Sequence, residues 1–297
     1  MTSLTLVPPK HLLRLSDLML LGVAVVWGTS YGVAKGALNY YPVLGFLAVR
    51  FLLTFLLLLL PTLLRLDRAT QRDALRSGLP LGALLLGIFL CETYGVALTQ
   101  ASNAAFLISL CVVFTPLVEW ALMGVRPARA VFGFVLMSLV GAALLSGGLS
   151  GSLGRGDGLM LVAALLRAFT VCQTSRLTRG STAPALALTA VQAGVIGLGS
   201  LLLAVCSPGG LPALPKEPAF WQASIYLVLG CTLFAFFAQS WALKHSPPTR
   251  VALLTSSEPA FGALFAVLWL GESLSTQGWI GGGLIVLAAL WTSVRRN

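Results

Sequence analysis

Residues 17–38 read DLMLLGVAVVWGTSYGVAKGAL, an almost unbroken run of apolar and small residues. In a helix, about 20 apolar residues span a hydrocarbon core roughly 30 Å thick, so this run is long enough to cross a bilayer. It is longer than the usual core of a signal peptide, and it carries Trp27, Tyr31 and Lys35. We therefore interpret it as a retained first helix.

Nine further apolar stretches follow, and together they predict an all-α membrane protein with ten transmembrane helices. Each span is expected to be helical because lipid offers no partner to free backbone N–H and C=O groups. The composition agrees, since 57% of the 297 residues are hydrophobic, only 9% are charged and the mean hydropathy is +0.92. The predicted spans cover residues 17–38, 42–64, 77–98, 102–124, 129–147, 158–177, 184–206, 219–243, 248–270 and 277–294.

The ten spans fall into two sets of five, and the hydropathy and charge pattern of the second set weakly echoes the first. We predict a first repeat over residues 1–147, a glycine-rich periplasmic linker over 148–157 and a second repeat over 158–297. Because five is an odd number, the second repeat crosses the membrane in the opposite sense. Inverted repeats are typical of secondary transporters, which bind substrate near the midplane where the halves meet.

The basic residues test this topology independently of hydropathy. With a cytoplasmic N-terminus, fourteen Lys and Arg residues lie inside and two outside, as the positive-inside rule requires. Both termini are therefore predicted to be cytoplasmic. Attraction to anionic inner-leaflet lipids accounts for the net charge of +10 without a nucleic-acid partner. The inner residues are Lys10, Arg14, Arg65, Arg68, Arg72, Arg76, Arg126, Arg129, Arg176, Arg179, Lys244, Arg250, Arg295 and Arg296, and the outer ones are Arg155 and Lys216.

Six ionisable side chains are clear cases of charge inside the membrane, away from the ends of the predicted spans, where each needs a partner or a function because charge is costly at that depth. Structural pairing is the favoured interpretation for Arg50 and Glu119. For Glu258, near the centre of the ninth span, we favour a functional role. The cations are Lys35, Arg50 and Arg167, and the anions are Glu92, Glu119 and Glu258.

In the first span, Trp27, Tyr31 and Lys35 recur every fourth residue, and each is followed by a glycine. The two stripes lie about 100° apart around a helix. We expect the glycines to pack against another helix. The aromatic stripe then borders a cavity, or else fills the bundle core; Lys35 favours a wet cavity, although it could snorkel to the outer surface.

The fourth and ninth spans occupy matching positions in the two repeats, and each contains a proline, Pro116 and Pro259. A proline frees a carbonyl and kinks its helix, and matched broken helices point to a transporter binding site. Thr115 precedes the first proline, whereas the run from Thr255 to Glu258 precedes the second. The hydroxyls of that run either face the substrate or satisfy the loosened backbone.

Several other functions fit the sequence poorly. The five cysteines match neither a metal site nor a disulfide framework, and no cofactor is expected. A membrane-embedded enzyme would need a polar catalytic cluster, yet His11 and His245 are the only histidines and both lie at the cytoplasmic margin. A channel is not indicated either, because nothing in the sequence resembles a repeated selectivity-filter motif.

A family resemblance is carried by Trp27-Gly28-Thr29-Ser30 with Lys35, by Arg50-Phe51 after Pro42, and by Glu258-Pro259, Leu270-Gly271-Glu272 and the glycines of the last span. In their order and spacing over nearly the whole chain, these residues resemble the EamA-type family of the drug/metabolite transporter superfamily. Length and character are most similar to the YddG-type exporters of aromatic and other amino acids. One departure is Gly124-Val125-Arg126-Pro127 where the second half has Gly271-Glu272, which puts a symmetric mechanism in doubt.

This resemblance implies a ten-helix exporter of the bacterial inner membrane that works by alternating access on amino acids, aromatic or otherwise neutral. It also implies a central cavity lined by the first, third, fourth, sixth, eighth and ninth spans. The alternatives are drug efflux and the exchange of nucleotide-sugars or phosphate esters. The cations Lys35, Arg50 and Arg167 are compatible with a phosphate-bearing substrate, because they could bind its phosphates.

The residues mapped onto that cavity combine aromatic walls with a few polar groups, as small-molecule sites usually do. Glu92 and Glu258 are the candidate partners for protons or a substrate ammonium, and Lys35 and Arg167 for a substrate carboxylate. The proposed substrate-binding residues are Trp27, Tyr31, Lys35, Glu92, Tyr94, Asn103, Phe106, Arg167, Gln173, Phe237, Trp241, Ser256, Ser257 and Glu258, with Pro116 and Pro259 breaking their helices.

Overall fold

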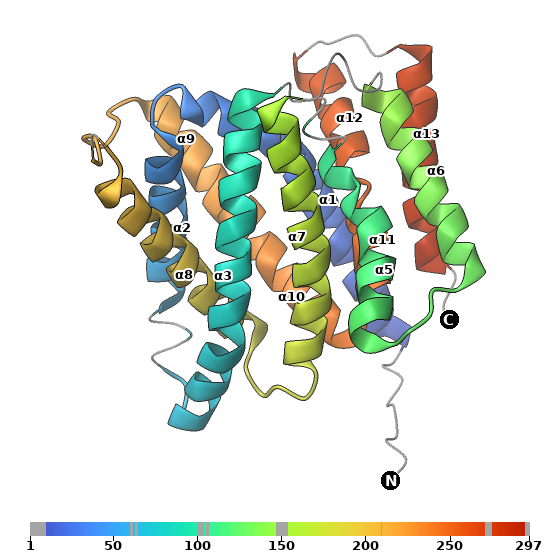
Figure 1. The fold of residues 1–297 in the computed structure, drawn as a ribbon, viewed down its shortest axis with the longest axis horizontal. Helices are drawn as coiled ribbons and strands as arrows, with labels where there is room; N and C mark the ends of the chain where they lie inside the picture. The colour runs from blue at the N-terminus through green and yellow to red at the C-terminus, as the bar shows by residue number, and fades with distance from the viewer. Residues whose placement is uncertain are drawn as a thin grey trace.

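The computed structural model describes residues 10–59, 62, 65–99, 104, 107–146, 154–208, 210–270 and 275–294. Within these ranges the chain is helical, joined by turns and short loops, and contains no strand (Figure 1). The longer helices are α1 (Lys10–Leu38), α2 (Val43–Leu59), α3 (Arg68–Leu98), α5 (Cys111–Met123), α6 (Arg129–Ser146), α7 (Arg155–Thr178), α8 (Ala185–Cys206), α9 (Pro218–Tyr226), the π-helix η2 (Leu227–Phe234), α10 (Ala235–His245), α11 (Pro248–Thr255), α12 (Glu258–Leu270) and α13 (Thr276–Val294).

Five helical segments of the described chain are long and apolar enough to cross a membrane: Leu15–Leu38, Arg68–Leu98, Arg155–Thr178, Ala185–Cys206 and Pro218–His245. Shorter apolar helices cover Val43–Leu59, Leu107–Met123, Arg129–Leu144 and Thr276–Trp291. Large apolar side chains such as Leu18, Leu202 and Leu268 point outward, 65–73% exposed, as they would toward lipid. The all-α, multi-pass prediction is confirmed for this part of the chain, whereas the count of ten stays a prediction.

Helices far apart in the sequence pack side by side. In Figure 1, α6 and α13 form a pair at one end of the bundle, and α2 packs against α8 at the other. Between these pairs, α3 contacts α7, α1 contacts both α10 and α12, and α5 contacts α7 and α11. The first turn of α1 and the last turn of α13 lie toward the same end of the bundle. The site described below lies among α1, α2, α3, α7, α10 and α12.

The two prolines in the matching fourth and ninth spans have different effects. Pro116 lies inside α5, which continues to Met123, and Thr115 Oγ1 donates to the Cys111 carbonyl at 2.7 Å. In the ninth span, α11 ends at Thr255 and α12 begins at Glu258, directly before Pro259. The chain is thus broken only at the second of these positions among the described residues.

The eighth predicted span contains a feature that hydropathy does not show. Its helix runs from Pro218 to His245, but the central eight residues form the π-helix η2. There the Ala235 N–H donates to the Gly230 and Thr232 carbonyls and not to the Cys231 carbonyl, its usual α-helical acceptor. Short π-helical segments often occur at functional sites.

Two other sequence expectations concern the glycines of α1 and the linker between the two repeats. The glycine stripe of α1 packs only at Gly28, where an added Cβ would lie 2.5 Å from the Glu258 carbonyl and 2.7 Å from the Gly262 nitrogen. Gly32 and Gly36 have no described atom within 4 Å of such a Cβ, so the prediction of a continuous packing ridge is wrong. Most of the predicted linker lies outside the described residues, and α7 already begins at Arg155.

Candidate functional site

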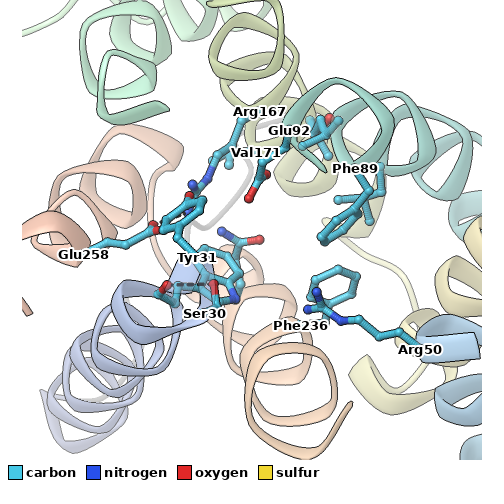
Figure 2. Close-up of a pocket in the computed structure, with 14 residues that line it drawn as sticks. Ser30, Tyr31, Arg50, Phe89, Glu92, Arg167, Val171, Phe236 and Glu258 are labelled. Atoms are coloured by element: carbon cyan, nitrogen blue, oxygen red, sulfur yellow. Dashed lines mark hydrogen bonds and ion pairs between the residues drawn. The ribbon is translucent and has the colours of Figure 1, made fainter. Parts of the chain in front are cut away.

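A cavity of about 550 Å³, including its mouth, lies among six helices. Three of them present one face to it at helical spacing, with residues 27, 30 and 31 from α1, 85, 88, 89 and 92 from α3, and 167, 170 and 171 from α7. Figure 2 shows these side chains around the opening. The lining consists of Trp27, Ser30, Tyr31, Arg50, Leu85, Ile88, Phe89, Glu92, Arg167, Thr170, Val171, Phe236, Gln239 and Glu258.

One side of the cavity holds a buried ion pair. Arg167 Nη2 on α7 donates to Glu258 Oε2 at 2.9 Å, and the two side chains are only 12% and 5% exposed. The Arg167 guanidinium also lies over the Trp27 ring, 4.4 Å from its centroid, a cation–π contact. Arg167 is therefore neutralised by a carboxylate and held by an indole.

The π-helix positions the indole. Trp27 Nε1 donates at 3.0 Å to the Cys231 carbonyl, which does not accept from Ala235 as it would in an α-helix. In return, Cys231 Sγ donates to the Val26 carbonyl at 3.4 Å. These reciprocal contacts fix α1 against η2 and orient the ring that Arg167 covers.

Arg50 on α2 lies on the opposite side of the cavity and is 6% exposed (Figure 2). Its Nε donates to Thr232 Oγ1 at 3.0 Å, while that hydroxyl donates to the Leu227 carbonyl at 3.0 Å within η2. The guanidinium carbon lies 5.1 Å and 5.4 Å from the ring centroids of Phe51 and Phe89. Among the described residues, Arg50 forms no ion pair.

The other polar residues of the lining are Ser30, Tyr31, Glu92, Thr170 and Gln239. Glu92 is on α3, on the Arg167 side of Phe89 in Figure 2, and within the described residues it too forms no ion pair. Tyr31 is 7% exposed and lies beside Glu258. Two arginines and two glutamates thus face one space, and only one of each is paired.

Five of the predicted substrate-binding residues come together in this cavity: Trp27, Tyr31, Glu92, Arg167 and Glu258. Three others lie apart from it. Lys35 is exposed and donates to the Thr99 carbonyl at 3.4 Å, Tyr94 is 38% exposed, and Trp241 stacks on His245 with ring centroids 4.7 Å apart.

The remaining predicted residues are also outside the lining. Ser256 and Ser257 are buried and donate to the Leu253 and Leu254 carbonyls at 2.7 Å each, so their hydroxyls satisfy the broken helix. Gln173 and Phe237 are half-buried and lie outside the cavity. In the sequence they are close to the lining residues Val171 and Phe236, respectively. Asn103 and Phe106 lie outside the described residues.

Sequence reasoning missed most of the apolar lining, and it interpreted Arg50 as structural. The signal that could have found these residues was spacing: Leu85, Ile88 and Phe89 share a helical face with Glu92, and Thr170 and Val171 share one with Arg167. Gln239 could have been noticed as an amide in the eighth span, farther from the span's start than Gln222.

Two further charged contacts lie toward the other end of α1, where α11 begins. Arg250 binds Asp17 through two bonds, Nη2 to Oδ2 at 2.7 Å and Nε to Oδ1 at 3.1 Å. Glu119 accepts from the backbone N–H of Thr249 at 3.0 Å and from its hydroxyl. Glu119 is thus structurally partnered, as expected, by the first turn of α11, while the Asp17 pair was not predicted.

The described residues contain no group of three His, Cys, Asp or Glu side chains that could hold a metal ion. Cys91, Cys111, Cys172, Cys206 and Cys231 are all free thiols. The described lining of the cavity offers groups for charge pairing, hydrogen bonding and aromatic contact.

Comparison with known proteins places this architecture among transporters. An uncharacterized transporter of Archaeoglobus fulgidus is 31% identical over 288 residues, covering 94% of this chain and 86% of that protein. The uncharacterized inner membrane transporter YedA of Escherichia coli K12 is 27% identical over 281 residues, with 91% and 88% covered. A solved crystal structure of a protein shares the fold with a TM-score of 0.74 and 20% identity, over 93% of this chain and 95% of that one.

The family model described as the EamA-like transporter family matches this chain twice, over residues 14–147 and residues 154–294. Together the two matches cover almost the whole sequence. The chain is a multi-pass membrane transporter and belongs to the EamA-like transporter family.

Proposed function

We propose that this transporter exports neutral amino acids, aromatic ones included, from the bacterial cytoplasm across the inner membrane by alternating access. The observation that carries the proposal is the cavity itself, which combines two arginines, two glutamates and four aromatic rings in one buried space.

The balance of charge favours a zwitterion over a phosphate ester. Glu258 neutralises Arg167, so Arg50 is the single cation of the described lining without a carboxylate partner, and Glu92 offsets it. A doubly negative phosphate would want several unpaired cations. An amino acid carries one charge of each sign and needs one partner for each.

The pattern of helix contacts supports an inverted repeat. If α1, α2, α3, α5 and α6 correspond in order to α7, α8, α9–α10, α11–α12 and α13, each principal contact between the halves has an exchanged counterpart. Contact of α1 with α10 matches that of α7 with α3, and contact of α1 with α12 matches that of α7 with α5. In repeat-built transporters, access alternates by rocking of one half against the other around the site.

The proposed topology and the proposed proton coupling rest on two further features. The positive-inside pattern orients both termini toward the cytoplasm. Glu258, at the break between α11 and α12, and Glu92 are the side chains proposed to exchange a proton as the cavity changes its access.

Growth in the presence of toxic amino-acid analogues tests the export of amino acids. Cells expressing the protein are expected to tolerate more p-fluorophenylalanine than cells with the empty vector or the Glu258→Ala variant. Ethidium serves as the drug arm of the same experiment. Resistance to ethidium without resistance to any amino-acid analogue would favour drug efflux instead.

A further inference from the structure

Two of the four charged side chains that line the cavity form an ion pair, and the other two do not. Arg167 is engaged by Glu258 and Trp27. Arg50 and Glu92 face the same space from opposite sides, and neither has an ion-pair partner in the described chain. We infer that the substrate lies between Arg50, which binds its carboxylate, and Glu92, which binds its ammonium group. This assignment rests on the proposed transport of amino acids and names the site that selects them.

The geometry of Arg50 leaves a defined face for a ligand. Its Nε is occupied by Thr232 Oγ1, and the rings of Phe51 and Phe89 lie close to the guanidinium carbon. The two terminal nitrogens have no acceptor among the described residues, and the side chain lines the cavity. Two parallel N–H donors on a planar guanidinium match the two oxygens of a carboxylate.

Burial makes a ligand the natural partner of this cation. An arginine 6% exposed at membrane depth is costly unless it is compensated, and one hydrogen bond with two aromatic contacts compensates it only in part. A substrate carboxylate would supply the missing charge. The uncompensated charge of Arg50 destabilises the empty cavity, and binding of a carboxylate removes that penalty.

Glu92 supplies the opposite end. It lies across the cavity from Arg50, with Phe89 and Phe236 between the two in Figure 2. The ring centroids of these phenylalanines are 5.9 Å apart, so they form an apolar wall along the space between the charges. A side chain that projects from the α-carbon can contact this wall, which favours apolar and aromatic amino acids.

Thr232 is the positioning residue of this arrangement. Its hydroxyl donates to the carbonyl of Leu227, five residues earlier, a spacing that η2 provides. With its proton committed there, the oxygen is left as an acceptor for Arg50 Nε. The π-helix therefore orients Trp27 through Cys231 and Arg50 through Thr232, one on each side of the cavity.

Binding of three related probes to the purified full-length protein tests the assignment by calorimetry. L-Phenylalanine carries both charges, phenethylamine lacks the carboxylate and 3-phenylpropionate lacks the ammonium. For Arg50→Gln we expect the Kd of phenylalanine and 3-phenylpropionate to rise about 10-fold to 100-fold, the value of a charge-assisted hydrogen bond, with phenethylamine within about 2-fold. For Glu92→Gln, phenylalanine and phenethylamine weaken instead. Arg176→Gln, an exposed arginine on α7, is the matched control.

Thr232→Val keeps the shape of the side chain but removes the oxygen that accepts from Arg50 Nε. This variant tests the assignment if the Arg50→Gln protein does not fold. We expect it to weaken phenylalanine and 3-phenylpropionate about 3-fold to 10-fold while sparing phenethylamine, and Thr232→Ser to restore binding. Thr189→Val is its control, because Thr189 bonds only to the Ala185 carbonyl of its own helix.

The outcomes separate this inference from the proposed function. If wild-type protein binds phenylalanine but Arg50→Gln weakens all three probes equally, Arg50 is structural and the assignment is wrong while amino-acid transport stands. Unchanged binding of phenylalanine by Arg50→Gln contradicts the assignment in the same way. If the wild-type protein binds none of the probes, the proposed function itself fails, and the inference with it.

Discussion

Arg167 Nη2 lies 2.9 Å from Glu258 Oε2, and this ion pair joins α7 to the first residue of α12. Because Glu258 stands at the break in the ninth span, the pair couples the wall of the cavity to the one described interruption of that span. Trp27 on α1 covers the same guanidinium. Arg167 is thus held between α12, through Glu258, and α1, through Trp27.

Glu258→Ala is expected to abolish transport while the protein still reaches the membrane. The substitution leaves Arg167 buried without its carboxylate, and breaking a buried pair in this way costs about 3–5 kcal/mol. We expect efflux to fall by about 100-fold or more at normal abundance in the membrane fraction. Glu217→Ala, an exposed residue before α9, is the control. Normal efflux by the Glu258 variant would refute a functional role for this residue.

Trp27→Phe is expected to reduce both stability and transport. It removes the hydrogen bond to the Cys231 carbonyl, worth about 0.5–1.5 kcal/mol, and loosens the ring over Arg167. Trp221→Phe removes a similar bond, 2.9 Å long, to the Pro215 carbonyl away from the cavity. The melting temperature should fall for both variants, whereas the rate of substrate exchange should fall only for Trp27→Phe. Equal exchange by the two would mean that the indole N–H has no role in the site.

Gly28→Ala is expected to destabilise the crossing of α1 and α12. Its Cβ would meet two backbone atoms, the Glu258 carbonyl at 2.5 Å and the Gly262 nitrogen at 2.7 Å, and overpacking of this kind costs about 1–3 kcal/mol. Gly32→Ala, one turn later on the same helix, meets no described atom within 4 Å. A loss of thermal stability should therefore appear in the first variant alone. Equal melting temperatures would contradict the close approach.

Charge exchange tests the pair between Asp17 and Arg250. Asp17→Arg and Arg250→Asp each place two like charges together in a buried site, and each should lower the melting temperature by about 10 °C. The double variant restores opposite charges, so more than half of the loss should be recovered. Additive losses in the double variant would show that the two residues do not act as a pair.

The helices were predictable from the sequence because lipid requires about 20 consecutive apolar residues for each span. The ends of the helices were less predictable. The helix α1 begins at Lys10, seven residues before the predicted span, because hydropathy marks only the part of a helix inside the membrane and a helix can continue through charged residues. The π-helix was not predictable. The sequence LVLGCTLF resembles any apolar helix, and its geometry is accompanied by contacts to Trp27 and Arg50 from distant segments.

The polar half of the site was largely accessible to sequence reasoning, and the apolar half was not. Arg167 and Glu258 attracted notice because charge is rare at membrane depth. Phe89 and Phe236 did not, because an apolar side chain that faces a cavity has the same sequence signature as one that faces lipid. Pairings such as Asp17 with Arg250 depend on contacts across 233 residues, which no local pattern reveals.

Counterflow in proteoliposomes measures the central claim most directly. Vesicles that contain the purified protein are loaded with unlabelled L-phenylalanine, and uptake of external labelled L-phenylalanine, UDP-glucose or ethidium is followed over time. We predict transient accumulation of labelled phenylalanine, absent from protein-free and Glu258→Ala vesicles and competed by other neutral amino acids. Vesicles loaded with each of the other two compounds provide the matching arms. Exchange of UDP-glucose or ethidium, with none of phenylalanine or any other neutral amino acid, would contradict the account.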